Sequence, residues 1–232
     1  MPRYRLLALL LCLLCAPWSL ASDLTPNRVR CQGTDYTYLL YAEAHTGPAP
    51  AILLLHGAGD HATSFIENWT HLAHRKGAVL IAPEIPRDLK FEAIAPDVFR
   101  CIVEDARRQV TIDATRIYLF GHSMGGYLGF DAAMFQSEYF AAAAIHGSDI
   151  ADDYVSILSH AKRKIPLAIY IGDNDHFFPL AHVHETRDRL EKGGFPVHFV
   201  EIVGHDHNYY RVAEQVNADA WKFFATETLA VK

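Results

Sequence analysis

Residues 117–126 read IYLFGHSMGG, so an apolar run leads directly into the pattern Gly-x-Ser-x-Gly around Ser123. A helix-like run of small and apolar residues follows at once over Met124–Phe135. This order predicts a sharp strand-to-helix turn that exposes the serine hydroxyl, with Gly121 and Gly125 leaving room for the flanking elements. Backbone N–H groups at a helix start stabilise developing negative charge. The stretch therefore predicts a nucleophilic serine; an ordinary Gly/Ser turn is the alternative.

The rest of the chain alternates strand-like and helix-like segments, and most of the strand-like runs are short and wholly apolar. Such strands are typical of a sheet buried on both faces, so we expect a mostly parallel α/β sheet with helices on both faces and its ligand site at the carboxyl ends of the strands. The predicted strands are Tyr36–Ala44, Ala51–Leu55, Ala78–Ala82, Arg116–Phe120, Ala141–Ile145, Leu167–Ile171 and Val197–Val203; the predicted helices are Ala62–Lys76, Asp97–Val110, Met124–Phe135, His182–Lys192 and Ala213–Ala225.

The composition describes a globular protein. Of the 232 residues, 50% are hydrophobic and 21% charged, which supplies apolar material for one sizeable core and excludes a disordered, collagenous or polytopic membrane chain. The formal net charge of −6 argues against a nucleic-acid partner and against an anionic membrane surface. No repeat or long linker interrupts the chain, so we expect residues 22–232 to form a single domain.

The first 21 residues have the pattern of a secretory signal peptide. Arg3 and Arg5 precede the apolar run Leu6–Ala16, and the small residues Ser19 and Ala21 occupy the −3 and −1 positions of a cleavage site. An uncleaved membrane anchor is the alternative, but the apolar run is short for one. We therefore expect a secreted or periplasmic protein without a stable membrane anchor after cleavage.

Two cysteines remain after such cleavage, Cys31 and Cys101. An even number in an exported chain favours one disulfide, whereas two unpaired thiols are the alternative. The bridge would close a loop of about 70 residues and stabilise the fold by about 4 kcal/mol in the chain-entropy model.

Two loops can supply the base and the acid that a serine nucleophile needs. After the strand Leu167–Ile171 the chain reads GDNDHFFP (172–179), and after Val197–Val203 it reads GHDHNYY (204–210). Both loops follow strands at the sheet edge expected for Ser123, in the chain order serine, acid, histidine. The candidate acids are Asp175, Asp173, Asp149 and Asp152, and the candidate bases are His207 and His205.

These motifs resemble those of small serine esterases of the α/β-hydrolase superfamily, over about Tyr36 to Ala225. The nearest resemblance is to the secreted branch of polyhydroxybutyrate depolymerases, feruloyl and acetylxylan esterases and dienelactone-hydrolase-like proteins. That branch has H-G-x-G after an early strand, G-x-x-D-x-x-x-P around the acid, and G-x-x-H followed by a polar and an aromatic residue. The corresponding stretches here are HGAG (56–59), GDNDHFFP (172–179) and GHDHNY (204–209).

The resemblance implies Asp175 as the acid and His207 as the base. A similar D-H-S-Y-Y stretch in S-formylglutathione hydrolases corresponds to DHNYY (206–210). Dienelactone hydrolases proper use a cysteine as nucleophile, and Ser123 departs from that pattern. Asp173 would instead accept local backbone hydrogen bonds, and His205 would pack beside the site.

The resemblance also implies an oxyanion hole formed by the backbone N–H groups of Ala58 and Met124. His56 and His122, which lie beside Ala58 and Ser123 in the chain, are expected to be structural. His56 would hold the loop that carries Ala58 through hydrogen bonds, and His122 would pack at the turn because its side chain leaves in a different direction from that of Ser123.

Fourteen histidines raise the question of a metal site. The closest pairs are His182 with His184 and His205 with His207, but there is no H-E-x-x-H pattern and no Cys/His spacing of a zinc site. His182 and His184 lie two residues apart on a predicted helix and so face different sides. We therefore expect no metal and no cofactor.

Four aromatic residues lie beside the acid and base loops: Phe177, Phe178, Tyr209 and Tyr210. They could line a substrate site or simply pack in the core. Phe177 and Tyr209 are the two that we expect to line the site.

Together these features predict a serine hydrolase that cleaves carboxylic esters through an acyl-enzyme. Peptide, amide or thioester hydrolysis on the same residues is an alternative, and so is a binding protein that keeps the fold. Only Gly147–Lys164 separates two predicted strands where many lipases have a large cap, so we expect an open site for a small-molecule or polymer-attached ester.

Overall fold

The structure, a computed structural model, describes residues 24–86 and 94–230. Eight strands form one sheet in the order β1-β2-β4-β3-β5-β6-β7-β8. Strands β1 and β2, and β2 and β4, pair antiparallel, whereas all the other neighbours pair parallel. The strands are β1 (Thr25–Cys31), β2 (Thr34–Tyr41), β3 (Ala49–Leu55), β4 (Val79–Pro83), β5 (Ile112–His122), β6 (Ala142–His146), β7 (Leu167–Gly172) and β8 (Val197–Ile202).

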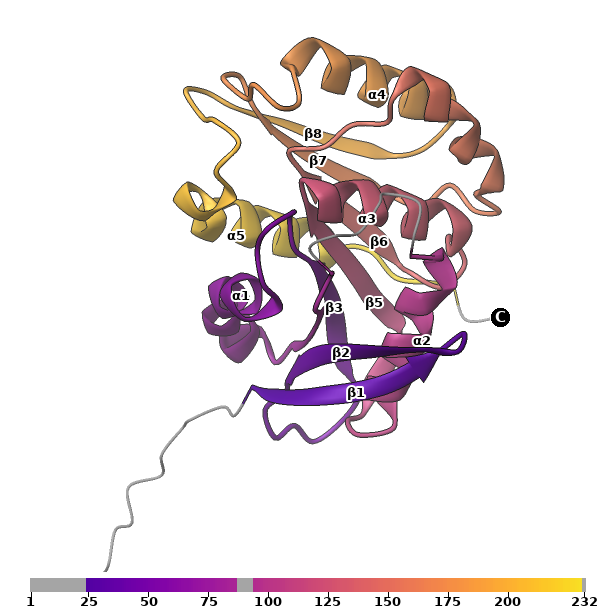
Figure 1. The fold of residues 1–232 in the computed structure, drawn as a ribbon, viewed down its shortest axis with the longest axis vertical. Coiled ribbons are helices and arrows are strands. Elements are labelled where there is room, and N and C mark those ends of the chain that lie inside the picture. The colour runs from indigo at the N-terminus through magenta and orange to yellow at the C-terminus, as the bar shows by residue number, and fades with distance from the viewer. Residues whose placement is uncertain (1–23, 87–93, 231–232) are drawn as a thin grey trace, which may run out of the picture.

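Helices cover both faces of this sheet (Figure 1). Helices α1 and α5 lie on one face, and α2, α3 and α4 lie on the other. The helices are α1 (Ala62–Lys76), α2 (Pro96–Arg107), α3 (Met124–Phe135), α4 (Leu180–Lys192) and α5 (Ala213–Phe224), with two 3-10 helices, η1 (Asp152–His160) and η2 (Tyr209–Arg211). The predicted fold class, a mostly parallel α/β-hydrolase sheet with helices on both faces, is confirmed.

The central strands are buried on both faces because each contributes to two apolar cores. In β3, Leu53 and Leu55 pack into the core beneath α2, α3 and α4. Their neighbours Ile52 and Leu54 point the other way, into the core beneath α1 and α5. Full burial of such a side chain contributes about 2 kcal/mol, so the uninterrupted apolar runs fix these strands at the centre of the sheet.

The sequence-based prediction missed one strand, β1. It pairs with β2 through a hairpin in which Gln32 and Gly33 both have positive φ, at 51° and 87°. Only Val29 and Cys31 of β1 are buried, so its edge position gives the sequence little hydrophobic alternation. Strand β5 is also longer than predicted. It already begins at Ile112, and a largely polar segment forms its first part, ahead of the apolar run.

A disulfide joins Cys31 of β1 to Cys101 of α2, as predicted. It ties the edge hairpin to a helix that packs on the sheet. The predicted signal peptide, residues 1–21, lies outside the described residues. No helix in the described part of the chain is long and apolar enough to cross a membrane.

The carboxyl ends of the parallel strands carry little additional structure. In the described ranges, the connection between β6 and β7 contains the short helix η1 and no large cap domain. The loops after β3, β5, β7 and β8 all lie at the carboxyl ends of the parallel strands and therefore share one edge of the sheet.

Candidate active site

The turn between β5 and α3 forces Ser123 into a strained backbone conformation. Its φ of 55° and ψ of −120° lie in a region that residues other than glycine rarely adopt. The two flanking glycines are required by close approach. A Cβ atom on Gly121 would lie 2.2 Å from the carbonyl oxygen of Gly125, and one on Gly125 would lie 2.1 Å from the carbonyl oxygen of Leu55. The Gly-x-Ser-x-Gly pattern is thus explained by packing.

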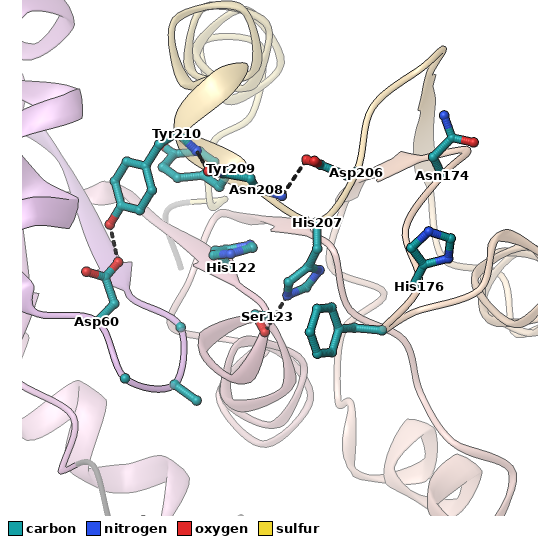
Figure 2. Close-up of a pocket in the computed structure, with 14 residues that line it drawn as sticks. Asp60, His122, Ser123, Asn174, His176, Asp206, His207, Asn208, Tyr209 and Tyr210 are labelled. Atoms are coloured by element: carbon teal, nitrogen blue, oxygen red, sulfur yellow. Dashed lines mark hydrogen bonds between the residues drawn. The ribbon is translucent and has the colours of Figure 1, made fainter.

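Ser123, His207 and Asp175 form a continuous hydrogen-bonded chain. The Oγ of Ser123 lies 2.8 Å from Nε2 of His207, and Nδ1 of His207 lies 2.7 Å from Oδ2 of Asp175 (Figure 2 draws the serine contact). Because a carboxylate only accepts, Nδ1 carries the proton that it donates to Asp175. Nε2 is then free to accept the hydroxyl proton of Ser123, which is the arrangement that nucleophilic activation requires.

Asp175 is held as a carboxylate in a buried position. Its side chain is fully buried, and its second oxygen accepts the backbone N–H groups of Phe177 at 2.9 Å and Phe178 at 3.0 Å. Burial alone would raise the pKa of Asp175, but the hydrogen bonds from His207 and from the two N–H groups outweigh it and lower that pKa. The acid is therefore charged and fixed in orientation beside His207.

The structure brings His207, and not His205, to Ser123. His205 is buried, with its ring centroid 5.4 Å from that of His146 in an edge-to-face arrangement. A Cβ on Gly172 would lie 2.1 Å from the His205 carbonyl oxygen, so the backbones of the loops after β7 and β8 are in close contact at this point. Asp173 accepts the N–H of Gly204 at 2.7 Å, a bond between the two loops.

Local hydrogen bonds fix the loop that carries His207. The N–H of Asn208 donates to Asp206 at 3.0 Å, and the N–H of Tyr210 donates to the side chain of Asn208 at 3.2 Å. Arg211 also donates to Asp206, at 2.8 Å. Asp206 and Asn208 thus hold the backbone on both sides of His207 through side-chain-to-backbone bonds.

The loop after β3 lies against Ser123. A Cβ on Gly57 would lie 3.4 Å from the Cβ of Ser123. Met124 is the first residue of α3, so its N–H has no acceptor within the helix. The N–H of Ala58 donates to no other described residue. Both groups are thus available beside the serine, as the oxyanion-hole prediction requires, and their role stays a prediction.

His56 holds that loop in place. Its Nε2 accepts the backbone N–H of Ile85 at 2.9 Å, so Nδ1 carries the proton and donates to the carbonyl oxygen of Gly57, also at 2.9 Å. Burial lowers the pKa of His56. A neutral His56 therefore links the loop after β3 to the end of β4, which agrees with the structural role expected for it.

Sequence reasoning did not anticipate a buried histidine pair behind His207. The Nδ1 atoms of His122 and His146 lie 3.0 Å apart, and the His122 ring centroid lies 4.9 Å from that of His207. Burial, followed by the nearby charge of His207, lowers the pKa of His122 to about 4. Burial also lowers the pKa of His146. Both rings are therefore neutral, and the His122 ring packs against the His207 ring.

Gly147, directly after β6, borders the His207–Asp175 contact. It has a φ of 57°, and a Cβ there would lie 3.1 Å from the His207 ring and 3.3 Å from Oδ2 of Asp175. A glycine is therefore needed here to leave room for the His207 ring and the Asp175 carboxylate. The only sequence signal for this was a glycine at the end of a buried strand.

A cavity of about 560 Å³ opens above Ser123 and His207. Phe177 lines it and is 76% exposed. Tyr209 borders the cavity from beneath but is 0% exposed, and its hydroxyl donates to Asn217 at 2.6 Å. Both residues thus border the cavity, Phe177 with an exposed ring and Tyr209 with a buried one, and their contact with substrate stays a prediction. Among the described residues, no group of three or more His, Cys, Asp or Glu side chains is placed to hold a metal ion.

One further hydrogen bond joins two residues that line the cavity. The hydroxyl of Tyr210, from the loop after β8, donates to the carboxylate of Asp60, from the loop after β3 (Figure 2). It joins the loop that carries His207 to the loop that carries Ala58.

Residues 86–225 match the dienelactone hydrolase family. The chain belongs to this family. It is therefore a hydrolase of the α/β fold, and the resemblance inferred from its motifs is confirmed. In this member of the dienelactone hydrolase family, Ser123 occupies the turn between β5 and α3. The search of curated protein sequences found no match.

Solved structures with the same fold include several esterases and serine hydrolases. A thermostable esterase is similar with a TM-score of 0.72 and 21% identity, over 89% of this chain and 63% of that one, so the chain spans under two thirds of its length. Esterase 2 of Thermogutta terrifontis gives 0.72 and 17%, over 88% and 94%. The fluorophosphonate-binding serine hydrolase F of Staphylococcus aureus gives 0.71 and 16%, over 86% and 97%.

Proposed function

We propose that this protein is a serine hydrolase that cleaves carboxylic esters through an acyl-enzyme. The observation that carries the proposal is the hydrogen-bonded chain from Ser123 through His207 to the buried Asp175, at the base of an open cavity. The names of the similar esterases support the ester as substrate class. No cofactor or metal is needed for this chemistry.

Acylation begins when Nε2 of His207 accepts the hydroxyl proton of Ser123 and the Oγ attacks the ester carbonyl carbon. Charge develops on the carbonyl oxygen, which the N–H groups of Ala58 and Met124 would stabilise; loss of one such donor typically raises the barrier by about 3 kcal/mol. Asp175 stabilises the imidazolium that forms. The tetrahedral intermediate collapses when His207 donates its Nε2 proton to the leaving alcohol oxygen.

Deacylation repeats the sequence with water. Nε2 of His207 accepts a proton from a water molecule that attacks the acyl carbon, and the same proton returns to the Oγ of Ser123 as the acid departs. No cap domain covers the cavity in the described part of the chain, and we infer that it accepts a small-molecule ester or an ester attached to a polymer.

The first experiment measures hydrolysis of one activated aryl ester by the wild type and by Ser123→Ala. We expect Ser123→Ala to fold normally and to lose at least about 10³-fold in kcat, since the three residues act as a unit. The same acyl group presented as ester, thioester and amide then ranks the substrate classes. A higher kcat/KM for the amide or thioester would replace the ester assignment while keeping the nucleophile.

A matched pair of variants tests the base. His207→Ala should lose at least about 10³-fold in kcat. His205→Ala should retain most of the activity, because His205 packs against His146 and makes no contact with Ser123. A larger loss for His205→Ala would exchange the two assignments.

We further propose that the protein acts outside the cytoplasm. The signal-peptide pattern of residues 1–21 supports this, as does the disulfide, a bond that persists in oxidising compartments. N-terminal sequencing of the exported protein should give Ser22 as the first residue. An intact Met1 on the exported material would contradict cleavage.

A further inference from the structure

Phe177 presents an exposed apolar ring to the cavity above Ser123, although exposed apolar side chains gain little from packing. It is an apolar side chain with 76% of its surface exposed, and it lines the cavity above the nucleophile. Its ring centroid nevertheless lies only 4.8 Å from that of His207. The backbone N–H of Phe177 donates to Asp175, so the acid that orients His207 also fixes the backbone beneath this ring.

The other aromatic residues of the two loops offer less apolar surface to a ligand. Phe178 is partly buried, with its ring stacked on His207 at 5.5 Å between centroids. Tyr209 is buried, and the hydroxyl of Tyr210 is engaged with Asp60. Phe177 is therefore the most exposed aromatic ring among the described residues that line this cavity.

The proposed chemistry dictates which part of an ester would meet this ring. Three groups surround the carbonyl carbon once Ser123 attacks. The carbonyl oxygen must face the N–H groups of Ala58 and Met124, and the leaving oxygen must lie within hydrogen-bond reach of Nε2 of His207 to receive its proton. The alcohol portion attached to that leaving oxygen is consequently on the His207 side, where Phe177 lies. The acyl portion takes the remaining direction.

We propose that Phe177 determines specificity for the leaving group: the enzyme prefers esters whose alcohol portion is aromatic or similarly broad and apolar, and this portion covers the Phe177 ring. The proposal rests on the ester hydrolysis proposed above and names the substrate class for that site. Covering exposed apolar surface during acylation lowers the barrier for such esters and leaves small alkyl esters unaffected. The alcohol departs before water attacks, so Phe177 has no part in deacylation.

The test compares two ester series with wild type, Phe177→Ala and Phe177→Leu. One series keeps acetate and varies the alcohol from ethanol to phenol and 2-naphthol. The other keeps phenol and varies the acyl chain. Every result is expressed as the ratio of variant to wild-type kcat/KM for the same ester, which cancels differences in intrinsic reactivity. Phe135→Ala is the matched control, because Phe135 is 41% exposed and does not line this cavity.

We expect Phe177→Ala to lower kcat/KM about 10-fold for phenyl and naphthyl acetate and less than about 2-fold for ethyl acetate, a 10-fold loss corresponding to about 1.4 kcal/mol. Phe177→Leu should restore part of the loss, and Phe135→Ala should change neither value. Across the acyl series the loss should be uniform. The breakdown rate of the acetyl-enzyme, measured after a burst of phenol release, should be the same in all variants.

Equal losses for aryl and ethyl acetate, or a slower acetyl-enzyme breakdown, would overturn the proposal, because they would show that the substitution disturbs Asp175 instead of the leaving group. A loss that varies with acyl length at constant alcohol would overturn it as well. In each of these cases Ser123-dependent hydrolysis persists, so the proposed function stands. Absence of ester hydrolysis in the wild type would instead overturn both.

Discussion

Acid should destabilise the fold through the neutral histidines behind His207, and His122 provides the clearest test. Burial and the neighbouring His207 lower its pKa from 6.5 to about 4 in the folded protein. Between these two values the unfolded chain binds the proton more strongly than the folded protein does. Stability from this group is therefore complete above pH 6.5 and is lost progressively as the pH falls towards 4.

The magnitude follows from the two pKa values. Protonation linkage with an unfolded pKa of 6.5 and a folded pKa of about 4 gives a loss of about 2 kcal/mol in the free energy of unfolding between pH 7.5 and pH 5. The variant His122→Asn keeps a hydrogen-bonding group towards His146 but has no basic nitrogen. Burial is the main cause of the lowered pKa of His146 and the nearby charge of His122 is the next, so the larger, burial effect on His146 remains in the variant.

The assay is urea denaturation of the wild type and the variant at pH 7.5 and at pH 5. The variant's loss of unfolding free energy between these pH values should be smaller than that of the wild type by about 2 kcal/mol. His160→Asn is the matched control, because His160 is an exposed residue whose ring stacks on Phe135 and has no contact with the histidines near His207. Equal pH dependences for wild type and His122→Asn would refute the reasoning, because His122 would then not be held neutral by the fold.

Three further predictions follow from the geometry. Asp175→Asn should keep the fold and lower kcat by about 10⁴-fold, because His207 would lose the partner that fixes its tautomer; a loss under about 10-fold on an aryl ester would contradict this. Gly125→Ala should lower the thermal midpoint sharply, because its Cβ would lie 2.1 Å from the carbonyl oxygen of Leu55; an unchanged melting curve would be inconsistent with that contact. Removal of the Cys31–Cys101 bridge by a double serine substitution should lower the free energy of unfolding by about 4 kcal/mol, and a denaturation midpoint equal to the wild type's would argue against the bridge.

Strand and helix positions were predictable where burial is uniform. Helices α1 and α3 begin and end at the predicted residues, because apolar spacing and a terminal Gly77 or Gly-x-Ser-x-Gly turn mark them locally. Edge strand β1 was missed because only Val29 and Cys31 are buried in it, and its sequence TPNRVRC has polar residues or proline at the other positions. A hairpin turn at Gln32 and Gly33 was the available signal, and it is weaker than Asn-Gly.

Some residues of the candidate site could likewise be predicted from the local sequence, and others could not. The positions of Ser123 and Asp175 could be inferred because each follows a buried strand, and that of His207 because it follows the last predicted strand, β8, of which only Ile202 is buried. The choice between His205 and His207 depends on which ring meets Ser123 and Asp175, and these are contacts between segments distant in sequence. The pairing of His122 with His146 joins two neighbouring strands and has no local pattern, so no single segment could reveal it.

Labelling with a fluorophosphonate, a reagent that phosphonylates activated serines, tests the central claim most directly. The folded protein should take up one equivalent, and peptide mass spectrometry should place the adduct on Ser123. His207→Ala should react far more slowly, and Ser123→Ala should remain unlabelled. Labelling of Ser123→Ala at an equal rate, or an adduct on another residue of the wild type, would contradict the assignment of Ser123 as the nucleophile.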